Sequence, residues 1–186
     1  MDNYDSILRR PNFKALKFYP KLIAIFDLTF YFTEHFLRAG DRTRDQMLQA
    51  ARSGKQNIVE GSADAITSTK MEMELIACSR GSLYELLADY EDYLRTRNLE
   101  YWDQNHQRTP KTKDFCLNIK VGDEYKPYIN RMNAEEFCNL CITLIHQAIS
   151  LMDGYINMLE RRFVTDGGFS ENLYRARTDY RNKNSK

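Results

Sequence analysis

Apolar residues recur at every third or fourth position along four long segments, and this pattern constrains the fold more than any other feature of the chain. Such spacing places the apolar side chains on one face of a helix, which must be buried against another element. Only four prolines and eight glycines occur in 186 residues, so long uninterrupted helices are favoured. The sequence therefore predicts an all-α protein.

Residues at the start of each segment match known patterns of helix initiation. Pro20 suits the first turn of a helix that we expect to run to Leu37. The other three segments begin with the spacing of a capping box, in which two side chains bond to free first-turn amides. These pairs are Thr43 with Gln46, Thr69 with Glu72, and Asn133 with Glu136.

Glycines mark the expected helix ends. Gly40 and Gly61 suit C-terminal caps of the first and second helices, because glycine adopts left-handed backbone angles without strain. The third helix is expected over residues 68–94. Gly167-Gly168 ends the fourth.

The helical pattern stops between residues 98 and 132, where Pro110, Pro127 and Gly122-Asp123 occur. We predict a short strand over Phe115–Val121 in this stretch, because a structureless connection of such length is uncommon. The predicted organisation has three parts. A lead-in covers 1–19, an antiparallel up-down-up-down four-helix bundle covers 20–160 with the 98–132 insertion, and a basic extension covers 161–186.

The third helix carries apolar residues on two adjacent stripes rather than one. So wide an apolar surface is typical of a helix buried on two sides, as in a bundle that also oligomerises. We therefore expect self-association through the first and third helices.

One spaced run and two short motifs in the second and third helices carry a family resemblance. The run is Gln46…Ala51…Ser53, and the two motifs are Asn57-Ile-Val-Glu60-Gly61 and Gly81-Ser82-Leu83-Tyr84-Glu85-Leu86. Over roughly residues 20–97 the chain resembles the four-helix-bundle proteins encoded in 23S rRNA intervening sequences. Those proteins are related to the accessory variability protein of diversity-generating retroelements.

This resemblance implies a bundle that assembles into a ring, typically a homopentamer. Members of the retroelement branch bind nucleic acid and partner with a reverse transcriptase, and most members of the family have no established activity. The extension after residue 160 resembles the suffix of a longer bacterial subgroup.

The polar members of the two motifs are predicted to act structurally. A buried polar group is costly unless it is paired, so we interpret them as a hydrogen-bond network that fixes helix packing. A ligand-binding or catalytic role remains the alternative. The residues are Asn57, Glu60, Gly61, Ser82 and Glu85.

No pattern in the sequence predicts a metal ion or cofactor. A di-iron bundle needs Glu-x-x-His pairs, and none occurs among His35, His106 and His146. Cys138 and Cys141 have a zinc-ligand spacing but lie in an apolar helix pattern, where free cysteine behaves as a small hydrophobe.

Basic residues form two groups. One lies along the second helix and comprises Arg42, Arg44, Arg52 and Lys55. The other lies in the extension and comprises Arg161, Arg162, Arg175, Arg177, Arg181 and Lys183. Tyr174 and Tyr180 alternate with the extension arginines, a pattern suited to phosphate contact and base stacking.

Charge is unevenly distributed although the net charge is only +1. Residues 68–94 hold two basic and six acidic side chains, and residues 161–186 hold seven basic and three acidic ones. The net charge excludes a uniform polycation. It also makes the third helix and the extension candidate electrostatic partners, within one chain or between chains.

The most apolar run, Leu22–Phe32, contains Asp27 and is too short to span a bilayer, so we expect no membrane partner. No secretory pattern is present, and a cytoplasmic protein is expected. The predicted function is a non-enzymatic, self-assembling scaffold or adaptor associated with RNA, DNA or a nucleic-acid enzyme. A direct nucleic-acid-binding module is the alternative, and a small-ligand protein or enzyme is a third reading.

Overall fold

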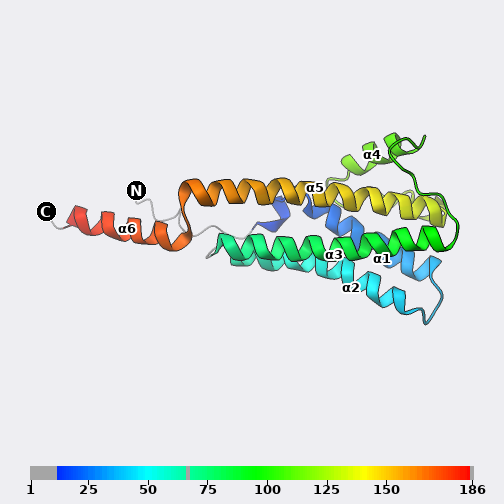
Figure 1. Cartoon of the computed structure of the whole chain (residues 1–186), viewed down its shortest axis with the longest axis horizontal. Coiled ribbons are helices and arrows are strands. Elements are labelled where there is room, and N and C mark those ends of the chain that lie inside the picture. The colour runs from blue at the N-terminus through cyan, green and yellow to red at the C-terminus, as the bar shows by residue number, and fades with distance from the viewer. Residues whose placement is uncertain (1–11, 66–67, 185–186) are drawn as a thin grey trace.

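A computed structural model describes residues 12–65 and 68–184, and within them every regular element is a helix (Figure 1). Four long helices pack side by side as a bundle: α1 (Tyr19–Phe36), α2 (Arg42–Asp64), α3 (Thr69–Thr96) and α5 (Ala134–Asp166). Helices α1 and α3 each contact both α2 and α5, and successive long helices run in opposite directions. The all-α prediction is confirmed. Across the described chain, no helix is sufficiently long and apolar to cross a membrane.

Aromatic rings from three helices fill the centre of the bundle. Phe32 on α1 lies 5.1 Å from Tyr90 on α3 and 5.8 Å from Phe137 on α5, measured between ring centroids. The buried Tyr90 hydroxyl donates to Thr29 Oγ1 over 3.0 Å, and Thr29 Oγ1 donates to the Ile25 carbonyl oxygen over 2.7 Å. This chain of bonds satisfies both buried hydroxyls, so the core tolerates them.

Small residues let α2 and α3 approach closely. The buried Ser79 hydroxyl on α3 donates to the carbonyl oxygen of Gly54 on α2. A Cβ atom added at Gly54 would lie 3.1 Å from Leu83 Cδ2, and one added at Gly61 would lie 3.1 Å from Leu75 Cβ. Gly61 is inside α2, which continues to Asp64, so the predicted left-handed cap at Gly61 is wrong.

Two predicted capping residues differ from those in the structure by one or two positions. The Asp41 side chain accepts from the Thr43 amide and caps α2, and the Ser68 side chain accepts from the Met71 amide and caps α3. Asp and Ser are strong capping residues, and each comes before the threonine that the sequence favoured. The capping box of α5 is confirmed, with Asn133 and Glu136 bonding reciprocally at 2.9 and 3.1 Å.

The insertion between α3 and α5 forms helix α4 (Thr109–Leu117), not the predicted strand over Phe115–Val121. Pro110 lies in the first turn of α4, where its missing amide is not needed. Two short 3₁₀ helices, η2 (Phe13–Ala15) and η3 (Ile129–Arg131), flank α1 and α5 respectively.

The insertion covers the side of the bundle formed by α1 and α5. The buried Lys21 ammonium of α1 donates to the carbonyl oxygen of Cys116 on α4. Tyr125 donates to Asp27 Oδ2 of α1 over 2.7 Å, and Gln147 of α5 donates to the Lys113 carbonyl oxygen over 3.0 Å. Part of the first-helix surface that was expected to drive association is therefore occupied by the insertion.

The C-terminal extension is helical and leaves the bundle. Gly167, with φ of +76°, ends α5, and α6 (Phe169–Asn184) follows directly. Figure 1 shows α6 continuing beyond the end of the bundle, away from α2 and α3. The sequence predicted a basic extension here but no helix.

Candidate functional site

An open groove runs between α2 and α3 on the outer side of the bundle, away from the insertion. It contains carboxylates from both helices and no basic side chain. The open surface therefore presents negative charge. Its lining residues are Asp45, Gln46, Gln49, Ala50, Ser53 and Glu85.

Acidic side chains continue along α3 next to this groove. Glu85 is exposed, Asp89 is half-buried one turn further along the helix, and neither forms an ion pair with another described residue. The pKa of Asp89 is raised, first by burial and then by the neighbouring charges of Asp92 and Glu85. The smaller contribution from Asp92 and Glu85 shows that like charges lie close together on this part of α3.

The motif residues predicted to form a polar network are not brought together. Asn57 is half-buried on α2, whereas Glu60 and Glu85 are exposed on α2 and α3. Within the described segments, no side-chain hydrogen bond joins any two of the five motif residues, and Ser82 donates to the Cys78 carbonyl oxygen of its own helix.

Ser79, rather than Ser82, makes the hydrogen bond that links α2 to α3. The sequence analysis did not predict this role for Ser79, because a single serine between Cys78 and Arg80 belongs to no recognisable motif. The signal was its position one turn before Leu83 on the buried stripe, opposite the small residues of α2.

The predicted basic group on α2 is partly engaged by its own chain. Arg44 pairs with Glu34 of α1, and Lys55 Nζ lies 4.1 Å from the centre of the Phe26 ring. Arg42 and Arg52 are exposed. Two of the four side chains are therefore committed to packing α2 against α1.

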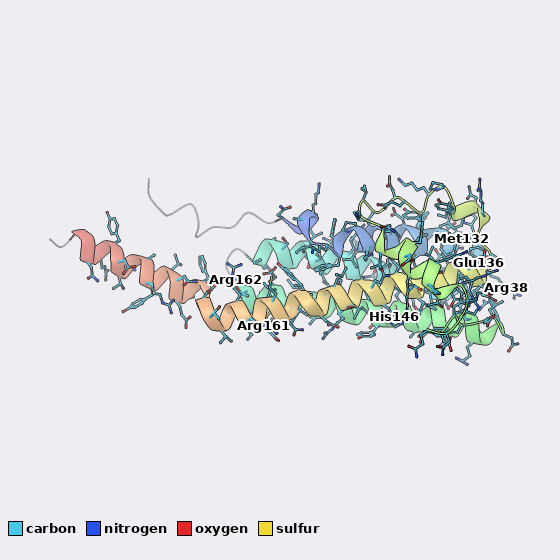
Figure 2. The ribbon with its side chains drawn as sticks, turned by 90° about the horizontal axis from the view of Figure 1, so that it is seen from above. Arg38, Met132, Glu136, His146, Arg161 and Arg162 are labelled. Carbon is cyan, nitrogen blue, oxygen red and sulfur yellow. The ribbon has the colours of Figure 1, made fainter. Side chains whose placement is uncertain are left out.

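The basic group of the extension is more accessible. Arg161, Arg175, Arg177 and Arg181 are exposed, and Arg162 pairs with Asp166 over 3.5 Å; the side chain of Lys183 lies outside the described residues. Figure 2 shows Arg161 and Arg162 at the far end of the bundle from Arg38, which precedes α2. The two predicted basic groups thus do not merge into one surface near the start of α2.

A second depression, of about 350 Å³, lies between the insertion and α5. It includes Trp102, whose indole N–H donates to Glu135 Oε1 over 3.3 Å and whose ring stacks on His106 at 5.0 Å. The Trp102 amide also donates to Asn139 Oδ1 over 2.8 Å. His146 borders the depression and is exposed (Figure 2). These contacts hold the insertion against α5, so we assign the depression a structural role.

Buried titratable groups serve packing. Burial lowers the pKa of Lys21, whose ammonium also donates to Gln147 Oε1 over 3.1 Å. Cys138 and Cys141 point into the core, and burial raises the pKa of the Cys141 thiol to about 12. Among the residues that the structure describes, no three His, Cys, Asp or Glu side chains converge as metal ligands.

No family model, curated protein or solved structure matches this chain. The resemblance to the intervening-sequence proteins therefore rests on the motif residues of α2 and α3 alone.

Proposed function

We propose that the protein is a non-enzymatic, cytoplasmic scaffold or adaptor that self-associates through surfaces outside its own bundle core. The observation that carries this proposal is α6. This helix presents Leu173, Tyr174 and Tyr180 at 42%, 73% and 57% exposure and makes no extensive contact with the four long helices. Exposed apolar groups gathered on one element mark interaction sites.

A second observation supports the proposal. The insertion covers α1 and α5, while the outer side of α2 and α3 carries no such cover in the described segments. One long side of the bundle is thus available to another molecule.

Light scattering coupled to size exclusion tests self-association directly. A single chain has a mass of 22.0 kDa, and we expect the full-length protein to elute at a multiple of that mass that falls on dilution. A mass of one chain at every concentration would reject the proposal.

We further propose that assembly closes into a ring. This step draws on the resemblance to the intervening-sequence proteins, whose typical state is a homopentamer. Native mass spectrometry gives the copy number, and five copies is the expected result. A distribution of lengths with no preferred copy number would reject ring closure while leaving self-association intact.

Direct nucleic-acid binding is the second candidate. Arg161 near the end of α5 is exposed, and so are Arg175 and Arg177 of α6, whose neighbours on that helix include the exposed rings of Tyr174 and Tyr180. Arginine with exposed aromatic rings is the chemistry that binds single strands.

Fluorescence anisotropy with labelled single-stranded RNA tests this candidate. Affinity should fall steeply between about 50 and 200 mM salt, because phosphate contacts release counterions. Replacing Arg161 and Arg175 by glutamine should weaken binding more than replacing Arg42 and Arg52. Binding that neither pair alters would exclude both predicted basic groups.

A further inference from the structure

Helix α6 has a defined apolar stripe, on which Leu173 and Tyr180 are exposed and Phe169 and Ala176 are half-buried in the described chain. Phe169, Leu173, Ala176 and Tyr180 follow at intervals of four, three and four residues, which aligns them on one face. Arg177 borders this stripe, whereas Arg175 lies on the opposite face, as the helical period of 3.6 residues requires. The stripe presents mostly large side chains with one small residue at Ala176.

Helix α3 has an exposed stripe with the same intervals and the opposite pattern of sizes. Ala77, Gly81, Tyr84 and Ala88 are all exposed, and Tyr84 retains 51% of its surface. A Cβ atom added at Gly81 would meet no other atom within 4 Å. The stripe is therefore small at three positions and large at one, so a helix with bulky side chains can approach it closely.

The charges beside the two stripes are also complementary. Glu85 follows Tyr84 on α3 and lies in the open α2–α3 groove, and Asp89 lies one turn further along the same side of the helix. Arg177 follows Ala176 on α6 and has no acidic partner in the described chain. Opposite charges at the edges of two apolar stripes favour their association and set its orientation.

The chain cannot bring its own α6 to this face in the observed arrangement. The Gly167 amide donates to the Phe163 carbonyl oxygen over 3.1 Å, and the Gly168 amide donates to Glu171 Oε2 over 3.0 Å. These bonds fix the junction so that α6 leads away from α3 of the same chain (Figure 1).

We propose that α6 of one copy docks through its apolar stripe on the outer face of α3 of a second copy, with Arg177 beside Glu85. This inference rests on the proposed self-association and names its contact. It places the bulky α6 side chains over Ala77, Gly81 and Ala88 and neutralises the acidic edge of α3.

Sedimentation of full-length variants tests the contact. Leu173→Asp should raise the dissociation constant at least tenfold, because it removes a leucine that the contact would bury and places a carboxylate against the acidic edge of α3. Arg177→Glu should also weaken assembly, whereas Arg175→Glu, the same change on the opposite face of the same helix, should not. Because α6 makes no extensive contact with the long helices, these changes should leave the circular dichroism of the bundle intact.

Charge reversal on the partner face completes the test. Glu85→Arg alone should weaken assembly, and the double variant Arg177→Glu/Glu85→Arg should restore it. Mixing the Arg177→Glu and Glu85→Arg variants should give assemblies that contain both. In such an assembly, the glutamate introduced at position 177 on α6 of one variant can pair with the arginine introduced at position 85 on α3 of the other.

The outcomes separate this contact from the broader proposal. If the wild type assembles but Leu173→Asp and Arg177→Glu do not change its mass, the contact is wrong and self-association stands. If Arg175→Glu weakens assembly as much as Arg177→Glu does, the proposed contact face of α6 is also wrong. A wild type that stays monomeric would overturn both.

Discussion

Replacing Gly61 by alanine should reveal how closely α2 and α3 are packed. Gly61 lies in the interior of α2, and an added Cβ atom would sit 3.1 Å from Leu75 Cβ and 3.5 Å from the Glu72 carbonyl oxygen. Carbon atoms attract best at about 3.5–4.0 Å. Leu75 Cβ is bonded to the backbone, so it can retreat only if α3 itself moves.

Two opposing effects set the size of the change. Alanine gains about 0.8–1.0 kcal/mol over glycine in a helix interior, which favours the variant. Overpacking a close contact costs about 1–3 kcal/mol, which opposes it. The balance is a Gly61→Ala protein that is destabilised by up to about 2 kcal/mol.

Gly154 on α5 provides the matched control. A Cβ atom there would have no neighbour within 4 Å, so Gly154→Ala keeps the propensity gain without the contact. We expect it to be more stable than wild type by about 1 kcal/mol. The two identical chemical changes should therefore differ by about 1–3 kcal/mol in the free energy of unfolding.

Urea unfolding followed by circular dichroism at 222 nm measures both variants. The midpoint should fall for Gly61→Ala and rise for Gly154→Ala, with the slope unchanged. If the urea midpoint of Gly61→Ala rises as much as that of Gly154→Ala, the close approach of α2 and α3 at Gly61 is refuted.

Three further predictions address the core, the insertion and the thiols. Tyr90→Phe should destabilise the protein by about 0.5–1.5 kcal/mol, and combining it with Thr29→Val should cost less than the sum of the single changes, because both partners of a buried bond are then removed; additive urea midpoints would contradict this. Glu124 is partly desolvated, but backbone amides that donate to it, among them those of Val121 and Lys120, outweigh that effect and lower its pKa to about 2. Its folded pKa is below its ordinary value of 4.5, so the stability advantage of wild type over Glu124→Gln should be full above pH 4.5 and vanish toward pH 2; an advantage that persists at the lowest pH would contradict the assignment. Ellman's reagent should modify one thiol, the exposed Cys78, in the dilute native chain and four after denaturation, and fast reaction of a second native thiol would show that the core is more open than described.

The long helices could be predicted from sequence because burial itself imposes their period. Leu22, Ile25 and Phe32 repeat on the face of α1 that enters the core, and all three are at most 1% exposed. Helix starts were less certain because several polar residues compete for one cap. At α2, Asp41 precedes Thr43, and the structure uses the aspartate.

The structure of the insertion and the role of Gly61 were harder to predict, because the local sequence pattern does not determine either of them. Helix α4 buries little more than Thr109 and Cys116, so its apolar period is weak, and the strand over Phe115–Val121 was predicted only because a structureless connection of that length is uncommon. At Gly61 the sequence predicted a left-handed cap, whereas in the structure the glycine allows a close contact with α3. Only the position of α3 decides between them, and sequence alone does not place α3.

The apolar period of α6 was present in the sequence but was not used. Phe169, Leu173 and Tyr180 share one face, yet arginines surround them and two glycines precede them. Because no other segment of the sequence was an evident partner for this stripe, the segment was interpreted as an extension without secondary structure, and α6 was not predicted.

Trp102 makes the insertion optically separable from the bundle. It is the only tryptophan in the chain, and its contacts with Glu135, Asn139 and His106 lie where the insertion meets α5, outside the aromatic core around Phe32. Its emission therefore senses the seating of the insertion, whereas ellipticity at 222 nm senses the long helices. Emission that red-shifts at a lower urea concentration than the loss of ellipticity would identify the insertion as a cooperative unit that opens while the bundle stays folded.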